Sequence, residues 1–139
     1  MYVVTQGSGA SSVNAGLVAD LRAQSWAPRV SPEILAFETV RGAPALVRGV
    51  EPDVYLALEG APPPAAAPTG DRWALAGARL ATRVGLAVGD EVALVGSSTA
   101  RLAVVRVGGL FSAGTSADDE LLVGLPMGEF LARLPPGVY

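Results

Sequence analysis

The sequence predicts an α+β fold in which a mixed sheet packs against helices. Apolar residues at helical spacing and apolar residues at alternate positions both occur, and the two patterns are interleaved along the chain. Half of the 139 residues are hydrophobic, which is enough for a substantial core in one domain. No apolar run approaches the ~20 residues that span a bilayer, so the chain as given is expected to be soluble.

The N-terminal half is expected to hold a strand, a helix and a hairpin. Residues 2–5 have a strand pattern, and the next apolar residues recur on one face of a helix capped by Ser12: Val13, Leu17, Val18 and Leu21. The hairpin is expected from strands at 34–40 and 45–48 with a turn at 41–44. Pro52 then fits the first turn of a short helix.

The C-terminal half is expected to begin with a semi-rigid loop or linker at residues 60–70, because four prolines there fix φ. The elements expected after it are a strand at 73–75, a helix at 77–86, a hairpin of 91–95 with 100–110, a strand at 120–123 and a helix at 126–134. The last helix should face the core with Met127, Phe130, Leu131 and Leu134.

The composition argues against several classes of function. Ten arginines against thirteen acidic residues give a net charge of −3, so a phosphate-tracking surface for nucleic acid is not expected. There is no cysteine, histidine or lysine. This removes the usual transition-metal ligands, the Ser-His-Asp arrangement and the Walker A lysine. No enzymatic activity, catalytic residue, metal or cofactor is therefore expected.

One acidic cluster and one glycine-rich loop are interpreted as structural segments and not as a metal site or a nucleotide site. The cluster at 118–120 fits a solvated loop before a strand and matches no EF-hand spacing. The loop at 7–12 has the placement of a dinucleotide loop but lacks its third glycine. The remaining carboxylates are interpreted as exposed turn residues, since nothing orients them as an acid–base pair: Glu33, Glu38, Glu51, Asp53 and Asp71.

Several segments resemble landmarks of one family. Residues 46–52, read LVRGVEP, resemble the "v-RGV-p" segment of the domain between the first two membrane helices of MacB/FtsX-type ABC transporter permeases. Residues 30–33, 74–86 and 88–94, together with 105–111 and 118–123, are similar to further landmarks of that family, in the same order. The resemblance covers residues 2–134.

The resemblance implies that residues 1–139 form one extracytoplasmic MacB-like periplasmic core domain, on the periplasmic or extracellular face of a membrane. It implies a porter-like α+β part and a β-hairpin-rich part. The family's large insert is expected to be reduced or absent, because the segment at residues 53–72 is short and proline-rich. The parent is expected to be a multi-pass and dimeric permease. Its implied partners are an ATP-binding cassette ATPase subunit and an extracytoplasmic cargo or adaptor protein.

Contacts with a partner are expected at the end away from the membrane, where loops collect. The candidate contact residues lie in the proline-rich loop, in the 96–99 turn and after the long strand: Ala66, Pro68, Ser97, Ser98 and Phe111. Two other functions remain open from the sequence. One is a secreted or cell-surface module that binds a small ligand, and the other is a hydrolase that uses only carboxylates.

Overall fold

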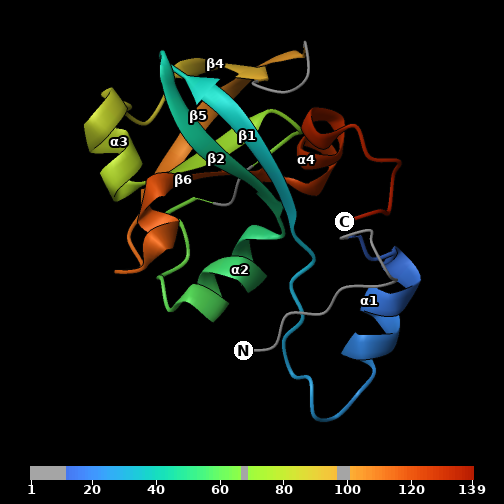
Figure 1. Cartoon of the computed structure of the whole chain (residues 1–139). Coiled ribbons are helices and arrows are strands. Elements are labelled where there is room, and N and C mark those ends of the chain that lie inside the picture. The colour runs from blue at the N-terminus through green and yellow to red at the C-terminus, as the bar shows by residue number, and fades with distance from the viewer. Residues whose placement is uncertain (1–11, 67–68, 97–100) are drawn as a thin grey trace.

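Six strands close into a barrel in this computed structural model, which describes residues 12–66, 69–96 and 101–139. The elements in chain order are α1 (Ala15–Arg22), β1 (Ile34–Val40), β2 (Ala43–Val50), α2 (Pro52–Glu59), β3 (Trp73–Gly77), α3 (Ala78–Val84), β4 (Glu91–Gly96), β5 (Leu102–Phe111), the 3-10 helix η1 (Ser116–Asp119), β6 (Glu120–Gly124) and α4 (Leu125–Ala132). Figure 1 shows the helices arranged around the barrel. The α+β class predicted from the sequence is confirmed.

The barrel combines local hairpins with two long-range parallel pairings. Its strand order is β1-β2-β6-β3-β5-β4, and pairing between β4 and β1 closes it. The hairpins β1–β2 and β4–β5 are antiparallel, as predicted, whereas β2 pairs with β6 and β3 with β5 in parallel. Both hairpins therefore belong to one sheet. Parallel neighbours require a crossover connection. The connection from β2 to β6 contains α2 and α3, the connection from β3 to β5 contains α3, and α4 follows β6.

The β1–β2 hairpin turns within two residues. Arg41 and Gly42 have φ values of 48° and 79°, the left-handed pair that a type I′ turn requires. Strand β2 resumes at once, because Ala43 already pairs with Val40. The turn is thus shorter than the four residues expected, and Pro44 is accommodated within the strand.

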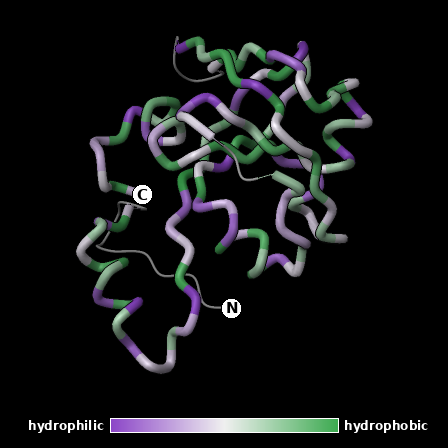
Figure 2. The backbone as a smooth tube through the Cα atoms, turned by 180° about the vertical axis from the view of Figure 1, so that it is seen from behind, coloured by the Kyte–Doolittle hydropathy of each residue, from purple (hydrophilic) through white to green (hydrophobic). Residues whose placement is uncertain are grey.

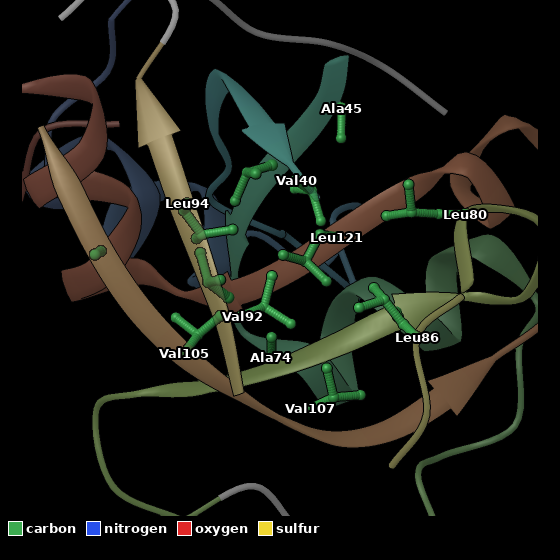
Figure 3. Packing of buried hydrophobic residues seen from close by; sticks show 14 of the residues in the cluster. Val40, Ala45, Ala74, Leu80, Leu86, Val92, Leu94, Val105, Val107 and Leu121 are labelled. Atoms are coloured by element: carbon green, nitrogen blue, oxygen red, sulfur yellow. The ribbon is translucent and has the colours of Figure 1, made fainter. Parts of the chain in front are cut away.

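Alternation along the strands fills the barrel with small and branched side chains. In β4 and β5, buried and exposed residues alternate, which places Val92, Leu94 and Val105 inside. Figure 3 shows these side chains meeting Val40 of the neighbouring strand β1 and Leu121 of β6. This cluster is the main hydrophobic core.

A second core lies on the outer surface of the barrel, beneath α2. Strands β3 and β6 are buried on both faces, so their alternate residues Leu75 and Leu122 point outward into this cluster. Tyr55 and Leu56 of α2 cover them. Gly60 ends α2 in a left-handed conformation with φ 74°, and Ala61 folds back to donate to the Leu56 carbonyl at 2.9 Å.

Helix α4 contacts the barrel closely because two glycines meet there. A Cβ atom added at Gly49 of β2 would lie 2.9 Å from the Cα of Gly128 in α4, and the reverse is also true. Within α4, Leu131 is buried and Met127 packs against the core, as predicted. The prediction for Phe130 is wrong: its ring is 44% exposed and lies 4.6 Å below the Arg101 guanidinium.

The described N-terminal residues lie against the C-terminus. Val13 and Tyr139 exchange two backbone hydrogen bonds of 2.8 and 2.9 Å, and Ala15 donates to the Gly137 carbonyl. Helix α1 is capped by Asn14 rather than by Ser12, because its side chain accepts from the Leu17 N–H at 2.9 Å. The strand expected at 2–5 and most of the 7–12 loop lie outside the described residues.

Figure 2 shows hydrophobic stretches along the barrel strands and more hydrophilic residues around α1 and in the segment after it. Among the helices of the described residues, none has the length and apolar character needed to cross a membrane. Most buried apolar residues of the strands belong to the two cores, whereas six apolar residues of β1, β4 and β5 are exposed: Leu35, Phe37, Val95, Leu102, Val104 and Leu110.

Candidate functional site

The structure places the predicted contact residues in different ways: one is exposed, one is buried, and three lie outside the described residues. Ala66 is exposed in the loop between α2 and β3, where a partner can reach it. Pro68, Ser97 and Ser98 lie outside the described residues. Phe111 is only 5% exposed, because its ring packs in the second core with the residues under α2. The expectation that Phe111 lies on the surface is therefore wrong, because Phe111 is a core residue.

A groove of about 630 Å³ lies where this loop meets the barrel. It is lined by Ala66 and residues 69–72 of the loop, by Trp73 of β3, and by Arg106 and Gly108 of β5. The loop passes close over β5, since a Cβ added at Gly109 would lie 4.0 Å from the Cβ of Pro64. The strands before and after the loop, β2 and β3, belong to the same barrel.

The side chains of the groove combine positive charge with one half-buried aromatic ring. Trp73 packs partly against the second core, and its indole lies beside Gly124, where an added Cβ would meet ring atoms at 3.5 and 3.6 Å. Arg106 is the register partner of Trp73 across the β3–β5 pair and is exposed. Arg72 precedes Trp73 and accepts the Arg106 N–H on its carbonyl at 2.7 Å. The two arginines are thus held at the same level of the groove.

The strongest charge cluster lies elsewhere, under α2. Arg48 of β2 forms two contacts with Glu120 of β6, from Nε to Oε2 at 2.7 Å and from Nη2 to Oε1 at 2.8 Å, and a third with Glu33 at 2.5 Å. The Tyr55 hydroxyl donates to Glu120 at 3.3 Å, and its ring lies 5.3 Å from the Arg48 guanidinium. Burial lowers the pKa of Arg48, but the hydrogen bond and charge of Glu120 outweigh it and raise the pKa. Burial raises the pKa of Tyr55.

Asp118 acts as a cap for the segment that leads into η1. Its carboxylate accepts the backbone N–H groups of Ala113 at 2.6 Å and Gly114 at 3.1 Å, and the Ser112 hydroxyl at 3.3 Å. These bonds, led by that from Ala113, lower the pKa of Asp118. The solvated loop expected at 118–120 is therefore wrong for the buried side chains of Asp118 and Glu120, whereas Asp119 is half-exposed and pairs with Arg79 at 2.9 Å.

Glu38 also departs from the exposed position expected for it. It occupies an inward-facing position of β1 between Ala36 and Val40 and is 3% exposed. Its Oε2 atom has no hydrogen-bond partner in the described structure. Burial accordingly raises the pKa of Glu38. Glu33 was also expected to be an unpaired turn carboxylate, but it pairs with Arg48.

None of these carboxylates forms a metal site in the described part of the chain, where no group of three potential ligands comes together. Glu120, Glu33, Asp118 and Asp119 are each committed to an arginine or to backbone N–H groups. The groove is therefore the candidate binding site for another molecule. Strand alternation could have marked Arg106 as outward-facing, but the path of the loop that brings Arg72 beside it has no local sequence signal.

No protein-family model and no curated protein sequence matches the chain. Solved structures similar to it include two transporter or permease domains. The extracellular domain of the noncanonic ABC-type transporter YknZ from Gram-positive bacteria matches 86% of this chain with a TM-score of 0.62 and 15% identity. A domain of a putative permease protein from Porphyromonas gingivalis matches 92% with a TM-score of 0.56 and 15% identity.

The chain covers 66% of the YknZ domain and 61% of the permease domain, so it spans less than two thirds of either. It has the fold of these transporter and permease domains. The resemblance to the extracytoplasmic domain of ABC transporter permeases, drawn from short sequence landmarks, is confirmed at the level of the fold.

Proposed function

We propose that this chain is the extracytoplasmic domain of an ABC transporter permease subunit. In this proposal it couples ATP-driven motion of membrane helices to the engagement of a cargo or partner outside the membrane. The observation that carries the proposal is the shared fold with the YknZ extracellular domain over 86% of the chain. The membrane helices would lie outside this sequence.

A backbone pairing between the segment before α1 and the segment after α4 supports the proposal. Val13 and Tyr139 exchange two backbone hydrogen bonds, so these two segments lie side by side. Two membrane helices that flank such a domain would enter it side by side. A movement between these helices would then act directly on α1 and on the segment after α4.

The proposed partners follow from this arrangement. An ATP-binding cassette ATPase subunit would supply the energy through the membrane helices, and a cargo or adaptor protein would contact the domain outside. We further propose that the parent permease is dimeric. A non-enzymatic role for the domain itself is supported by the pairing of its acidic clusters with arginines and backbone N–H groups.

The partner contact is proposed at the proline-rich loop around Ala66 and Pro68 and at the β4–β5 turn with Ser97 and Ser98. Figure 1 supports a distal position for the hairpin, because β4 lies at the top of the view and α1 lies below and to the right of the barrel. Exposed loops on a rigid barrel are common positions for recognition.

Labelling with a membrane-impermeant maleimide tests the location. The chain has no cysteine, so Ala19→Cys in exposed α1 adds one thiol to it. In the full-length gene product, cleared of other cysteines, this thiol should react in intact cells. Reaction only after the cells are permeabilised would contradict an extracytoplasmic domain. In a second, independent test, the full-length protein should copurify with an ATP-binding cassette subunit. Failure to copurify would contradict the transporter role.

A further inference from the structure

We propose that the groove beneath the proline-rich loop binds an extended acidic segment of a partner protein, with Arg72 and Arg106 each pairing with a carboxylate. The inference rests on the partner-binding role proposed for this loop and names the chemistry of the partner. Three features of the groove carry it: two available guanidinium groups, an aromatic wall and an open floor.

The availability of the two guanidinium groups distinguishes them from most arginines of the chain. Six arginines donate from their side chains to carboxylates or backbone carbonyls: Arg22, Arg41, Arg48, Arg79, Arg83 and Arg101. Within the part of the chain that the structure describes, Arg72 and Arg106 have no such partner, although Asp71 lines the same groove. The residues that line the groove thus include two cations and one anion, and Glu91 of β4, the register partner of Arg106, forms no ion pair with it in the described structure.

Carboxylates are suitable ligands for these groups. The planar guanidinium presents paired N–H donors that match a carboxylate, and such charge-assisted bonds are stronger than neutral ones. Because the protein carries a net charge of −3, its long-range field does not attract an acidic partner. The attraction is confined to the groove, where it selects a segment that is acidic at the right positions.

The non-polar part of the groove favours a peptide over a small anion. Trp73 presents a half-buried indole, Ala66 a methyl group, and Gly108 an open position where an added Cβ would meet only the Ala74 carbonyl oxygen at 3.9 Å. Arginine and tryptophan are both enriched at protein interfaces. A volume of about 630 Å³ lies within the range of ligand clefts and exceeds the needs of one phosphate group.

A fluorescence titration on the chain itself tests the inference. Trp26→Phe removes the exposed second indole and leaves Trp73 as the only tryptophan. Addition of the capped peptide Ala-Glu-Ala-Glu-Ala should change Trp73 emission with saturation, and the Gln counterpart should not. Arg72→Gln and Arg106→Gln should each weaken binding about two- to fivefold, the range for exposed charge pairs. Higher salt should weaken it further.

Arg29→Gln and Arg133→Gln are matched controls, because these two arginines also lack side-chain partners in the described structure but do not line the groove. They should leave the affinity unchanged. Equal weakening by the controls, or equal binding of the Gln peptide, would overturn the inference. So would inorganic phosphate that displaces the peptide and produces the same emission change, since that result identifies a small-anion site. Because no transporter is needed, such a failure would leave the proposed permease function standing.

Discussion

Arg48 and Glu120 form a two-point ion pair across the parallel strands β2 and β6, with N–O distances of 2.7 and 2.8 Å. The Glu120 side chain is 7% exposed and that of Arg48 is 18% exposed. The pair therefore lies in a region with little solvent screening. It joins two strands that are far apart in sequence, and it sits beside the ring of Tyr55 from α2.

Removal of the carboxylate charge from this pair should strongly destabilise the fold. Glu120→Gln leaves the Arg48 guanidinium with only Glu33 as a charged partner, and breaking a buried pair costs about 3–5 kcal/mol. Urea unfolding followed by circular dichroism measures the loss. Asp119→Asn is the matched control, because its half-exposed pair with Arg79 should contribute less than about 1 kcal/mol. Equal losses in the two variants would contradict a structural role for the buried pair.

Glu38 should make the protein less stable as the pH rises. Burial raises its pKa above the ordinary 4.5, so between these values the folded state holds more protons than the unfolded state. Stability then falls with increasing pH through this interval, as a buried carboxylate becomes charged. Glu38→Gln removes the titration, so its stability relative to the native chain should increase from pH 4 to pH 7. A difference that stays constant with pH would contradict this prediction.

Asp118 should produce the opposite dependence on pH. Hydrogen bonds from Ala113, Gly114 and Ser112 lower its pKa, so its contribution to stability is present above the ordinary value of 3.8 and is lost as the pH falls. Asp118→Asn places an amide N–H₂ among these donors. It should cost about 1–3 kcal/mol at pH 7 and less at pH 3, as measured by urea unfolding. A loss of stability in this variant that increases at lower pH would contradict the prediction that the three donors stabilise the ionised carboxylate.

Gly77 should not tolerate a side chain. A Cβ at this position would lie 2.3 Å from the carbonyl oxygen of Asp118, and a backbone atom cannot move away as a flexible side chain can. Gly77→Ala should therefore cost about 1–3 kcal/mol, as overpacking does. Gly108→Ala is the control within the same sheet, because its added Cβ would meet the nearest atom at 3.9 Å. Thermal unfolding of both variants should separate the two sites.

The local elements were predictable from the sequence, because alternation and turn residues encode them. The hairpins β1–β2 and β4–β5, the helix begun by Pro52 and the helix after β6 all follow from such signals. The closed barrel was not predictable, since the parallel pairings of β2 with β6 and of β3 with β5 join distant segments. For the same reason, Glu38 and Glu120 were misplaced on the surface: each is buried by strands that are remote in sequence.

The candidate site, like the fold, was only partly predictable from the sequence. The exposure of Ala66 was predictable from a loop that its prolines keep out of helix and strand. The burial of Phe111 was not, because it depends on α2 packing over the outer face of the barrel. The pairing of Trp73 with Arg106 depends on the β3–β5 register, including the irregularity between Ala74 and Leu75. A single sequence does not reveal such a register.

Charge placed in the loop should impair the transporter without unfolding the domain. Ala66→Asp changes an exposed residue of the groove, and exposed loop substitutions usually alter stability by no more than about 0.5 kcal/mol. The new carboxylate would repel an acidic partner segment and offer Arg72 and Arg106 a competing partner, so transport by the full-length permease should fall. Ala19→Asp on exposed α1 is the control and should transport normally. If Ala66→Asp transports normally while Ala19→Asp does not, the functional contact lies near the termini, and the domain acts as a mechanical coupler.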